Sequence, residues 1–288
     1  MRRSHPAVRA VLTLAHASAH TLARARPLAP ALALAHAVPF ALALAACAAP
    51  AGERGLTVFA ASSLRDVFVE LGGAFQDARP GVRITFSFDA TNALRAQIEQ
   101  GARADVFVSA DETTTRALAD AGLASRPSMF AENRLAIVTP VSGTAVTEPA
   151  DLARTGVRFV TAAADVPITR YAERALGRLA RLPGYPDRFA ERVLSNVVSR
   201  EDNARAVLAK IELGEGDAAI VYATDARSSD AVLTVAIPAE ANVTIPYSAA
   251  AMTGSEISAL ASAFVMWLDG PEAEAILRTH GFTVPAGP

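Results

Sequence analysis

Cysteine and histidine are scarce in this chain of 288 residues. The single cysteine, Cys47, excludes an internal disulfide framework and a metal site built from several cysteines. Of the five histidines only His280 lies beyond residue 46, so a Ser-His-Asp triad would depend on that one side chain. The sequence also lacks a Gly-x-Ser-x-Gly elbow, a Walker loop and an HExxH motif. These absences disfavour the common hydrolytic, nucleotide-dependent and zinc-dependent enzymes.

Acidic side chains are absent from the first 46 residues, which contain five arginines and four histidines. The first carboxylate of the chain belongs to Glu53. The remaining residues carry 22 basic and 29 acidic side chains, a net charge of about −7. An acidic body disfavours nucleic acid or an anionic membrane surface as the partner.

Charged residues are also missing from Pro27 to Gly52, and this stretch contains the tetrapeptide Leu44–Cys47. A basic leader, an apolar segment and small residues before a cleavage point are typical of a secretory signal peptide. The tetrapeptide resembles a bacterial lipobox, whose cysteine becomes the lipidated first residue of the mature protein. The alternative is a plain signal peptide or a membrane anchor with an incidental cysteine. We predict a lipoprotein-type signal peptide over residues 1–46, lipidation at Cys47 and a tether over residues 47–54.

Beyond the leader, short apolar runs rich in β-branched residues alternate with longer stretches in which apolar residues recur at helical spacing. This alternation predicts an α/β fold with largely parallel strands, and the length favours two domains. The expected strands are Leu56–Ala60, Val82–Phe88, Asp105–Ser109, Leu135–Thr139, Val157–Thr161, Val193–Val198, Ala218–Tyr222 and Val232–Ile237. The expected helices are Leu64–Ala78, Asn92–Gln100, Thr113–Ala121, Arg170–Ala180, Ala204–Leu213, Ser255–Leu268 and Pro271–His280.

Several of these strands or loops lead into a helix through small or hydroxylated residues. The junctions are residues 61–66, 89–92, 165–169 and 201–204. Backbone N–H groups at a helix start have no partner within the helix, and several such starts together can hold an anion. The alternative is that these are ordinary helix caps, which every α/β protein has in number. Spacing alone leaves both interpretations open.

A series of longer motifs carries a family resemblance. The segments are VFAASSL (Val58–Leu64), ALRAQIEQGA (Ala93–Ala102), ADVFVSAD (Ala104–Asp111), Val166–Pro167, Tyr171–Ala172, Glu201–Asn203, AIVYATDA (Ala219–Ala226) and His280–Phe282. In this order they resemble the substrate-binding proteins of bacterial molybdate ABC importers, over residues 56–282. The last segment, His-Gly-Phe, stands where that family has Tyr-Gly-Phe.

The resemblance implies a type II periplasmic-binding-protein fold, in which two α/β domains enclose a ligand cleft crossed by two connections. Domain I would contain residues 55–138 and 244–288, and domain II residues 139–243. The return to domain I is expected near Asn242–Tyr247.

The resemblance also implies a site. The family holds its oxyanion by hydroxyl groups and backbone amides. Carried over position by position, the ligand-binding residues are Ser63, Thr91, Ile168, Ala204 and Tyr222. Ser63 and Thr91 would supply hydroxyl and amide donors, Ile168 and Ala204 backbone N–H groups, and Tyr222 its phenolic hydroxyl. Asp89 and Asn92, the bulky Ile168 and the order Pro246-Tyr247 depart from the family pattern.

The implied function is capture of molybdate, or of the similar tungstate, for an ABC permease. A donor-only cage would bind a tetrahedral dianion and disfavour a protonated phosphate, which needs an acceptor. The protein is expected to be a monomer outside the cytoplasm, in contact with the membrane only through its lipid anchor. It would need no cofactor, no metal-ion ligands and no nucleic acid.

Three alternatives remain open. The same fold could bind sulfate, phosphate or a small organic anion. Carboxylates such as Asp89 or Asp202 could complete a six-coordinate site, as in an archaeal-type tungstate and molybdate binder. An enzyme on a similar α/β scaffold is the third.

Overall fold

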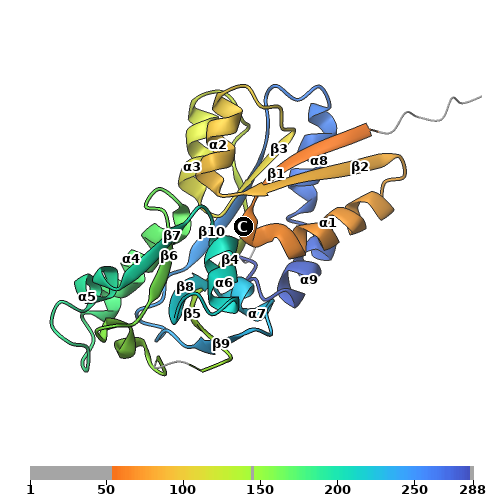
Figure 1. The fold of residues 1–288 in the computed structure, drawn as a ribbon. Coiled ribbons are helices and arrows are strands. Elements are labelled where there is room, and N and C mark those ends of the chain that lie inside the picture. The colour runs from red at the N-terminus through yellow and green to blue at the C-terminus, as the bar shows by residue number, and fades with distance from the viewer. Residues whose placement is uncertain (1–53, 144–145, 286–288) are drawn as a thin grey trace, which may run out of the picture. The chain divides into compact units, whose positions relative to one another are not determined.

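Two five-stranded sheets form the framework of the computed structural model, which describes residues 54–143 and 146–285 (Figure 1). The first sheet has the order β2-β1-β3-β10-β4, and the second has the order β7-β6-β8-β5-β9. Strands of the first sheet are β1 (Arg54–Ala61), β2 (Val82–Asp89), β3 (Val106–Ser109), β4 (Ser128–Asn133) and β10 (Ile245–Ala251). Strands of the second sheet are β5 (Leu135–Pro140), β6 (Phe159–Ala162), β7 (Val197–Glu201), β8 (Ala218–Tyr222) and β9 (Val232–Val235). Both sheets belong to one compact unit, Ala48–Pro288.

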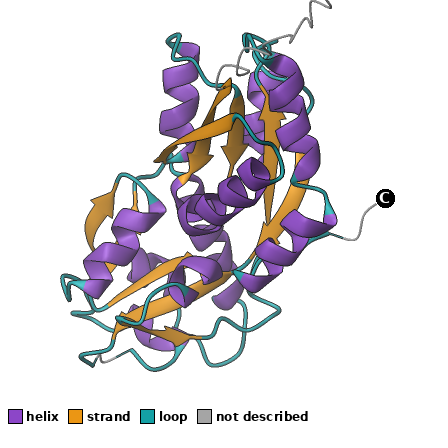
Figure 2. Ribbon diagram, turned by 90° about the vertical axis from the view of Figure 1, so that its right-hand side faces the viewer, coloured by secondary structure: helices purple, strands orange, loops and turns teal. Residues whose placement is uncertain are grey.

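Helices cover both faces of the first sheet because its strands are apolar on both sides (Figure 2). Val58 of β1 packs into the larger core, whereas its neighbour Phe59 packs into a separate cluster with Phe107 of β3. The helices on this sheet are α1 (Arg65–Asp77), α2 (Thr91–Glu99), α3 (Glu112–Asp120), α8 (Ser258–Trp267) and α9 (Pro271–Thr279). We call this sheet and its helices the first lobe.

The second lobe consists of the other sheet and the helices that belong to it. These are α4 (Pro167–Leu179), α5 (Phe189–Ser195), α6 (Ala204–Glu212) and α7 (Ala223–Arg227). Every residue of β5, β6 and β8 is buried, as expected for strands in the interior of a sheet that helices cover. Short 3₁₀ helices precede α1 (Ser62–Leu64) and β6 (Pro149–Ala153).

The chain crosses between the sheets twice. It leaves the first sheet at Asn133 and enters the second at Leu135, so the crossing lies before the boundary expected at residue 138. The reason is that β5 pairs with β8 and β9, not with a strand of the first lobe. The second crossing lies between Val235 and Ile245. This segment overlaps residues 242–247, near which the return to domain I is expected.

The expected α/β architecture is confirmed, whereas the strands that were expected to be largely parallel form two mixed sheets, in which β5 and β10 pair antiparallel with their neighbours. Several elements also differ from the sequence-based prediction. The strand predicted over 193–198 is wrong, because Phe189 and Val193, four residues apart, are buried on one face of α5. Strand β7 begins only after Asn196, which caps that helix. Strands β4 and β10 and helix α7 were not predicted. The serine, alanine and proline content of the two strands gives little β-propensity.

Cys47, the predicted signal peptide and residues 47–53 of the predicted tether lie outside the described residues. Within 54–143 and 146–285, none of the helices combines the length and the apolar character that a membrane crossing requires.

Candidate functional site

A small buried cavity lies where strand ends and helix starts of both lobes meet. Its volume is about 10 Å³, which is room for roughly one water molecule. The lining residues are Ala61, Ser62, Ser63, Asp89, Ala90, Thr91, Ala110, Val166, Pro167, Ala204 and Tyr222. Four of the five residues predicted from the sequence are therefore brought together. Ile168 is not among the lining residues, although Val166 and Pro167 directly before it are.

Ser63 lies in the 3₁₀ helix that follows β1, and its side chain is buried. This short helix places the Ser63 hydroxyl beside that of Tyr247 in β10, with 2.9 Å between the two oxygens. Tyr247 is fully buried in the first lobe. The order Pro246-Tyr247 is the one feature of the sequence that marks Tyr247, and its contact with Ser63 was not predicted.

Thr91 is the first residue of α2 and is almost fully buried. The backbone N–H of Ala110, which follows β3, donates to Thr91 Oγ1 over 3.2 Å. A backbone N–H can only donate, so the proton of the Thr91 hydroxyl is free to point elsewhere. Thr91 thus faces the cavity with an available O–H donor.

The second lobe contributes two helix starts. Helix α4 begins at Pro167, which has no N–H, so the first backbone donor of this helix belongs to Ile168. Helix α6 begins at Ala204, after the cap residue Asn203, whose Oδ1 accepts from the N–H of Ala206 over 3.0 Å. The leading N–H groups of both helices have no acceptor within their helix, and the macrodipole makes these ends electropositive. Both starts can therefore donate to an anion.

Tyr222 ends β8 and is buried to 98%, its exposed fraction being 2%. Burial, with smaller contributions from Tyr247 and Tyr171, raises the pKa of the Tyr222 hydroxyl well above its usual value. The hydroxyl therefore keeps its proton at neutral pH and remains a donor. Among the residues that the structure describes, none forms a hydrogen bond with it.

Asp89 is the one carboxylate among the lining residues. Its Oδ1 accepts from the backbone N–H of Ala90 over 2.7 Å and faces Asn203 Nδ2 of the second lobe over 3.4 Å. The cage expected from the family resemblance has donors only, whereas the lining of this cavity includes the carboxylate of Asp89. One wall carries a negative charge and an acceptor.

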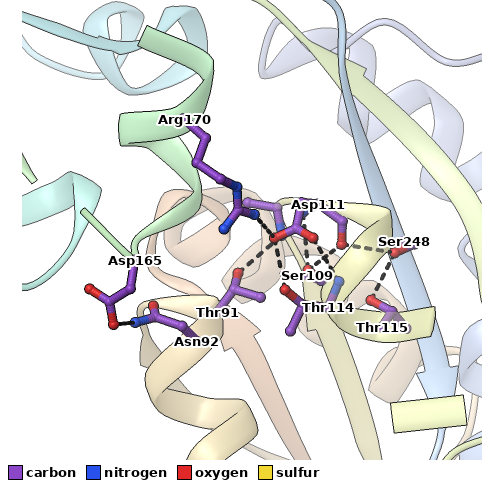
Figure 3. A network of polar contacts seen from close by, with 10 residues as sticks. Thr91, Asn92, Ser109, Asp111, Thr114, Thr115, Asp165, Arg170 and Ser248 are labelled. Carbon is purple, nitrogen blue, oxygen red and sulfur yellow. Dashed lines mark hydrogen bonds and ion pairs between the residues drawn. The ribbon is translucent and has the colours of Figure 1, made fainter. Parts of the chain in front are cut away.

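Polar contacts join the two lobes on either side of Thr91 (Figure 3). Arg170 of α4 reaches Asp111 at the start of α3, with 3.3 Å between Nη2 and Oδ2. Asp111 is almost fully buried and also accepts from the backbone N–H of Thr114 over 2.7 Å. On the other side of Thr91, Asn92 Nδ2 donates to Asp165 over 2.6 Å.

A third contact between the lobes lies beside Ser63. Arg205, the second residue of α6, forms an ion pair with Asp66 of α1. The two helix starts that carry Ser63 and Ala204 are thus tied to each other. Together with the pairs around Thr91, this contact bridges the two lobes.

Neither the motif that ends at Asp111 nor the order Pro246-Tyr247 indicated a role at the site, and nothing in the sequence marked Arg170. Each of the three residues contacts a partner that is distant in the chain. Tyr247 and Ser63 are 184 positions apart. Within the described ranges, no group of three or more histidine, cysteine, aspartate or glutamate side chains is arranged to hold a metal ion.

Residues 56–283 match the family model described as bacterial extracellular solute-binding protein. The chain belongs to this family. The molybdate-binding protein ModA of Mycobacterium tuberculosis is 35% identical over 240 residues, covering 81% of this chain and 86% of the relative. The resemblance predicted from the sequence motifs is therefore confirmed.

Solved structures agree with this family assignment at the level of the fold. The periplasmic molybdate-binding protein of Azotobacter vinelandii superposes with a TM-score of 0.68 at 22% identity, covering 80% of this chain and 100% of that one. The sulfate-binding protein SubI of Mycobacterium tuberculosis superposes with a TM-score of 0.70 at 17% identity, covering 80% of this chain and 86% of that one. The two-lobed framework is thus shared with binders of different oxyanions.

Proposed function

We propose that this chain is a binding protein, not an enzyme, that captures molybdate for an ABC importer in the cavity between its lobes. The observation that carries the proposal is the convergence of Ser63, Thr91, Ala204 and Tyr222, from both lobes, on one buried cavity. Relatives that are at least 30% identical and cover most of the chain are named as molybdate-binding proteins.

Neutral groups would hold the anion. The hydroxyls of Ser63, Thr91 and Tyr222 and the leading N–H groups of α4 and α6 would donate to its oxygens. Hydrogen bonds to a charged acceptor are short and about twice as strong as neutral ones, so no cationic side chain is required. Neutral donors also suit a carrier that must release its cargo.

The size of the cavity implies a conformational step. A tetrahedral anion with four oxygens is larger than the single water that about 10 Å³ admits. The lobes would therefore separate to admit the anion, and the cavity would stay wider around the bound anion than it is in this structure. The contacts Arg170–Asp111, Asn92–Asp165 and Arg205–Asp66 would break when the lobes separate.

Several further properties belong to the same proposal. Tungstate would bind as molybdate does, since the two anions have nearly the same size and charge. The protein would act as a monomer outside the cytoplasm, attached to the membrane by lipid at Cys47. The permease of the importer would be its partner, and no cofactor would be required.

Asp89 favours one second candidate, a binding protein for a protonated oxyanion such as hydrogen phosphate. A carboxylate in the cavity wall repels a dianion, but it accepts a hydrogen bond from a protonated oxygen.

Titration of the purified protein with molybdate, tungstate, sulfate and phosphate distinguishes these candidates. We expect molybdate and tungstate to raise the stability of the protein, by about 2.7 kcal/mol at a hundredfold excess over the dissociation constant. Calorimetry and thermal unfolding would measure the effect. Stronger binding of phosphate than of molybdate would favour the second candidate, and equal binding of all four would indicate a general oxyanion carrier.

A further inference from the structure

We propose that Tyr247 and Asn133 fix the direction of the Ser63 hydroxyl, so that Ser63 donates its proton into the cavity. Tyr247 is thus a positioning residue that acts on the ligand through Ser63. The proposal rests on the function proposed above and adds the device by which one of its donors is oriented.

Asn133 is the last residue of β4 and is almost fully buried at the first crossing between the lobes. The backbone N–H of Arg134 donates to Asn133 Oδ1 over 2.8 Å. Because a backbone N–H needs an acceptor, this contact assigns the oxygen of the amide and leaves Nδ2 facing the other way. Nδ2 lies 2.8 Å from Thr224 Oγ1 and 3.4 Å from the Tyr247 hydroxyl.

The direction of the next hydrogen bond follows from the chemistry of the amide. An amide NH₂ carries two protons and only donates, so Asn133 presents a proton to both Thr224 and Tyr247. The Tyr247 oxygen accepts there, and its own proton is left for Ser63 Oγ, 2.9 Å away. A phenol is also a stronger acid than an aliphatic hydroxyl, which favours the same direction.

The Ser63 oxygen is consequently occupied as an acceptor, and its proton is free for a ligand. Thr91 reaches the same state by a different route, because the N–H of Ala110 occupies its oxygen. Two hydroxyls on different strand ends are therefore both prepared as donors before the anion arrives. A serine without such a partner could turn its lone pairs toward the anion instead.

Tyr247 is suited to this task because it stays protonated. Burial raises the pKa of its hydroxyl far above neutrality, and this effect exceeds the opposing effect of the bonds with Ser63 and Asn133. Its ring is packed edge-on against Phe282 and Tyr222, which fixes the position of the hydroxyl. A phenylalanine at this position would keep these ring contacts and lose only the donor.

A double-mutant cycle tests the proposal. The protein and its variants Tyr247→Phe, Ser63→Ala and the double variant are titrated calorimetrically with molybdate, and their unfolding is compared. We expect Tyr247→Phe to raise the dissociation constant about three- to tenfold, as for loss of one neutral hydrogen bond. In the Ser63→Ala background the same change should have no further effect, because the hydroxyl on which it acts is gone.

Tyr185→Phe serves as the matched control, since Tyr185 packs against Phe189 in the second lobe. Tyr185 neither lines the cavity nor bonds to Ser63, Asn133 or Tyr247. It should bind molybdate as the unaltered protein does. Two outcomes would overturn the proposal even where the unaltered protein binds molybdate. One is that the losses of affinity of the two single variants add in the double variant, and the other is an unchanged affinity in Tyr247→Phe. Failure of the unaltered protein to bind any oxyanion would instead refute the proposed function, and this proposal with it.

Discussion

At the scale of single residues, Tyr222 is the donor that a substitution tests most cleanly. Its ring is packed in the core, and its hydroxyl lacks a hydrogen-bond partner within the described part of the chain. Tyr222→Phe therefore removes the donor with little effect on folding. A hydrogen bond to a charged group contributes about 1.5–3 kcal/mol, so the dissociation constant for molybdate should rise roughly ten- to a hundredfold.

Calorimetric titration of Tyr222→Phe beside Tyr185→Phe would measure this loss. Ala204→Gly should weaken binding less than Tyr222→Phe, because the backbone N–H at this position survives the change. An affinity of Tyr222→Phe equal to that of the control would show that the cavity is not where the anion binds.

The candidate site residues were named from the family resemblance, because local spacing alone left ordinary helix caps as an alternative. Ser63, Thr91, Ala204 and Tyr222 stand at strand ends or helix starts, within or close to the motifs that carry the resemblance. Asn133 could not be found in this way. Its role depends on a contact with Tyr247, 114 positions away, which no local pattern encodes.

At the scale of secondary-structure elements, one arginine connects three helices. Arg205 of α6 pairs with Asp66 of α1 and lies 3.6 Å from Asp225 of α7, measured from Nε to Oδ1. Burial raises the pKa of the Asp225 carboxyl to about 7, with a smaller upward contribution from Asp66, although Arg205 lowers it. One of its oxygens, Oδ2, is buried without a hydrogen-bond partner in the described structure.

This shift determines how stability depends on pH. The folded-state pKa of Asp225 is raised above its unfolded value, so between pH of about 4 and 7 the folded state binds the proton more tightly than the unfolded state. The free energy of unfolding therefore falls as the pH rises through this window. Asp225→Asn removes the effect, because its amide does not titrate.

We expect the variant Asp225→Asn to gain stability relative to the unaltered protein as the pH rises from about 4 to 7, and to gain nothing further above. Urea unfolding at a series of pH values measures the difference, which should reach a few kcal/mol at most. The exposed Asp230→Asn, which also replaces a carboxylate by an amide, is the matched control. A pH-independent difference between the two proteins would contradict the assignment.

The limits of prediction at this scale have physical causes. Helix α6 was located from the sequence because its apolar spacing is regular and Asn203 and Gly214 flank it, and strand β8 because it is a short continuous apolar run. Strand β10 was not, since Ile245–Ala251 is stabilised by its position between β3 and β4, not by its own propensity. Tertiary pairing overrides a weak local preference in such a strand.

At the scale of the whole molecule, the distribution of charge separates the first 46 residues from the rest. The basic leader lacks acidic residues, whereas the remaining chain carries a net charge of about −7. An acidic body is repelled by anionic lipid, so a carrier that serves a membrane permease gains from a covalent anchor. If Cys47 carries the predicted lipid, this second point of attachment would raise the local concentration of the carrier near a permease.

The anchor predicts a measurable change in location. Cys47 follows a charge-free apolar stretch in a lipobox-like tetrapeptide, and its thiol is the only one in the chain. In a bacterial host the protein should sediment with membranes and carry a diacylglyceryl group at Cys47, which mass spectrometry would detect. Cys47→Ser removes the acceptor sulfur and should release the protein or leave its leader uncleaved. The control Ala51→Ser, a small change four positions later, should remain membrane-bound. The anchor would be refuted if Cys47→Ser fractionated as the original protein does and the original protein carried no lipid adduct.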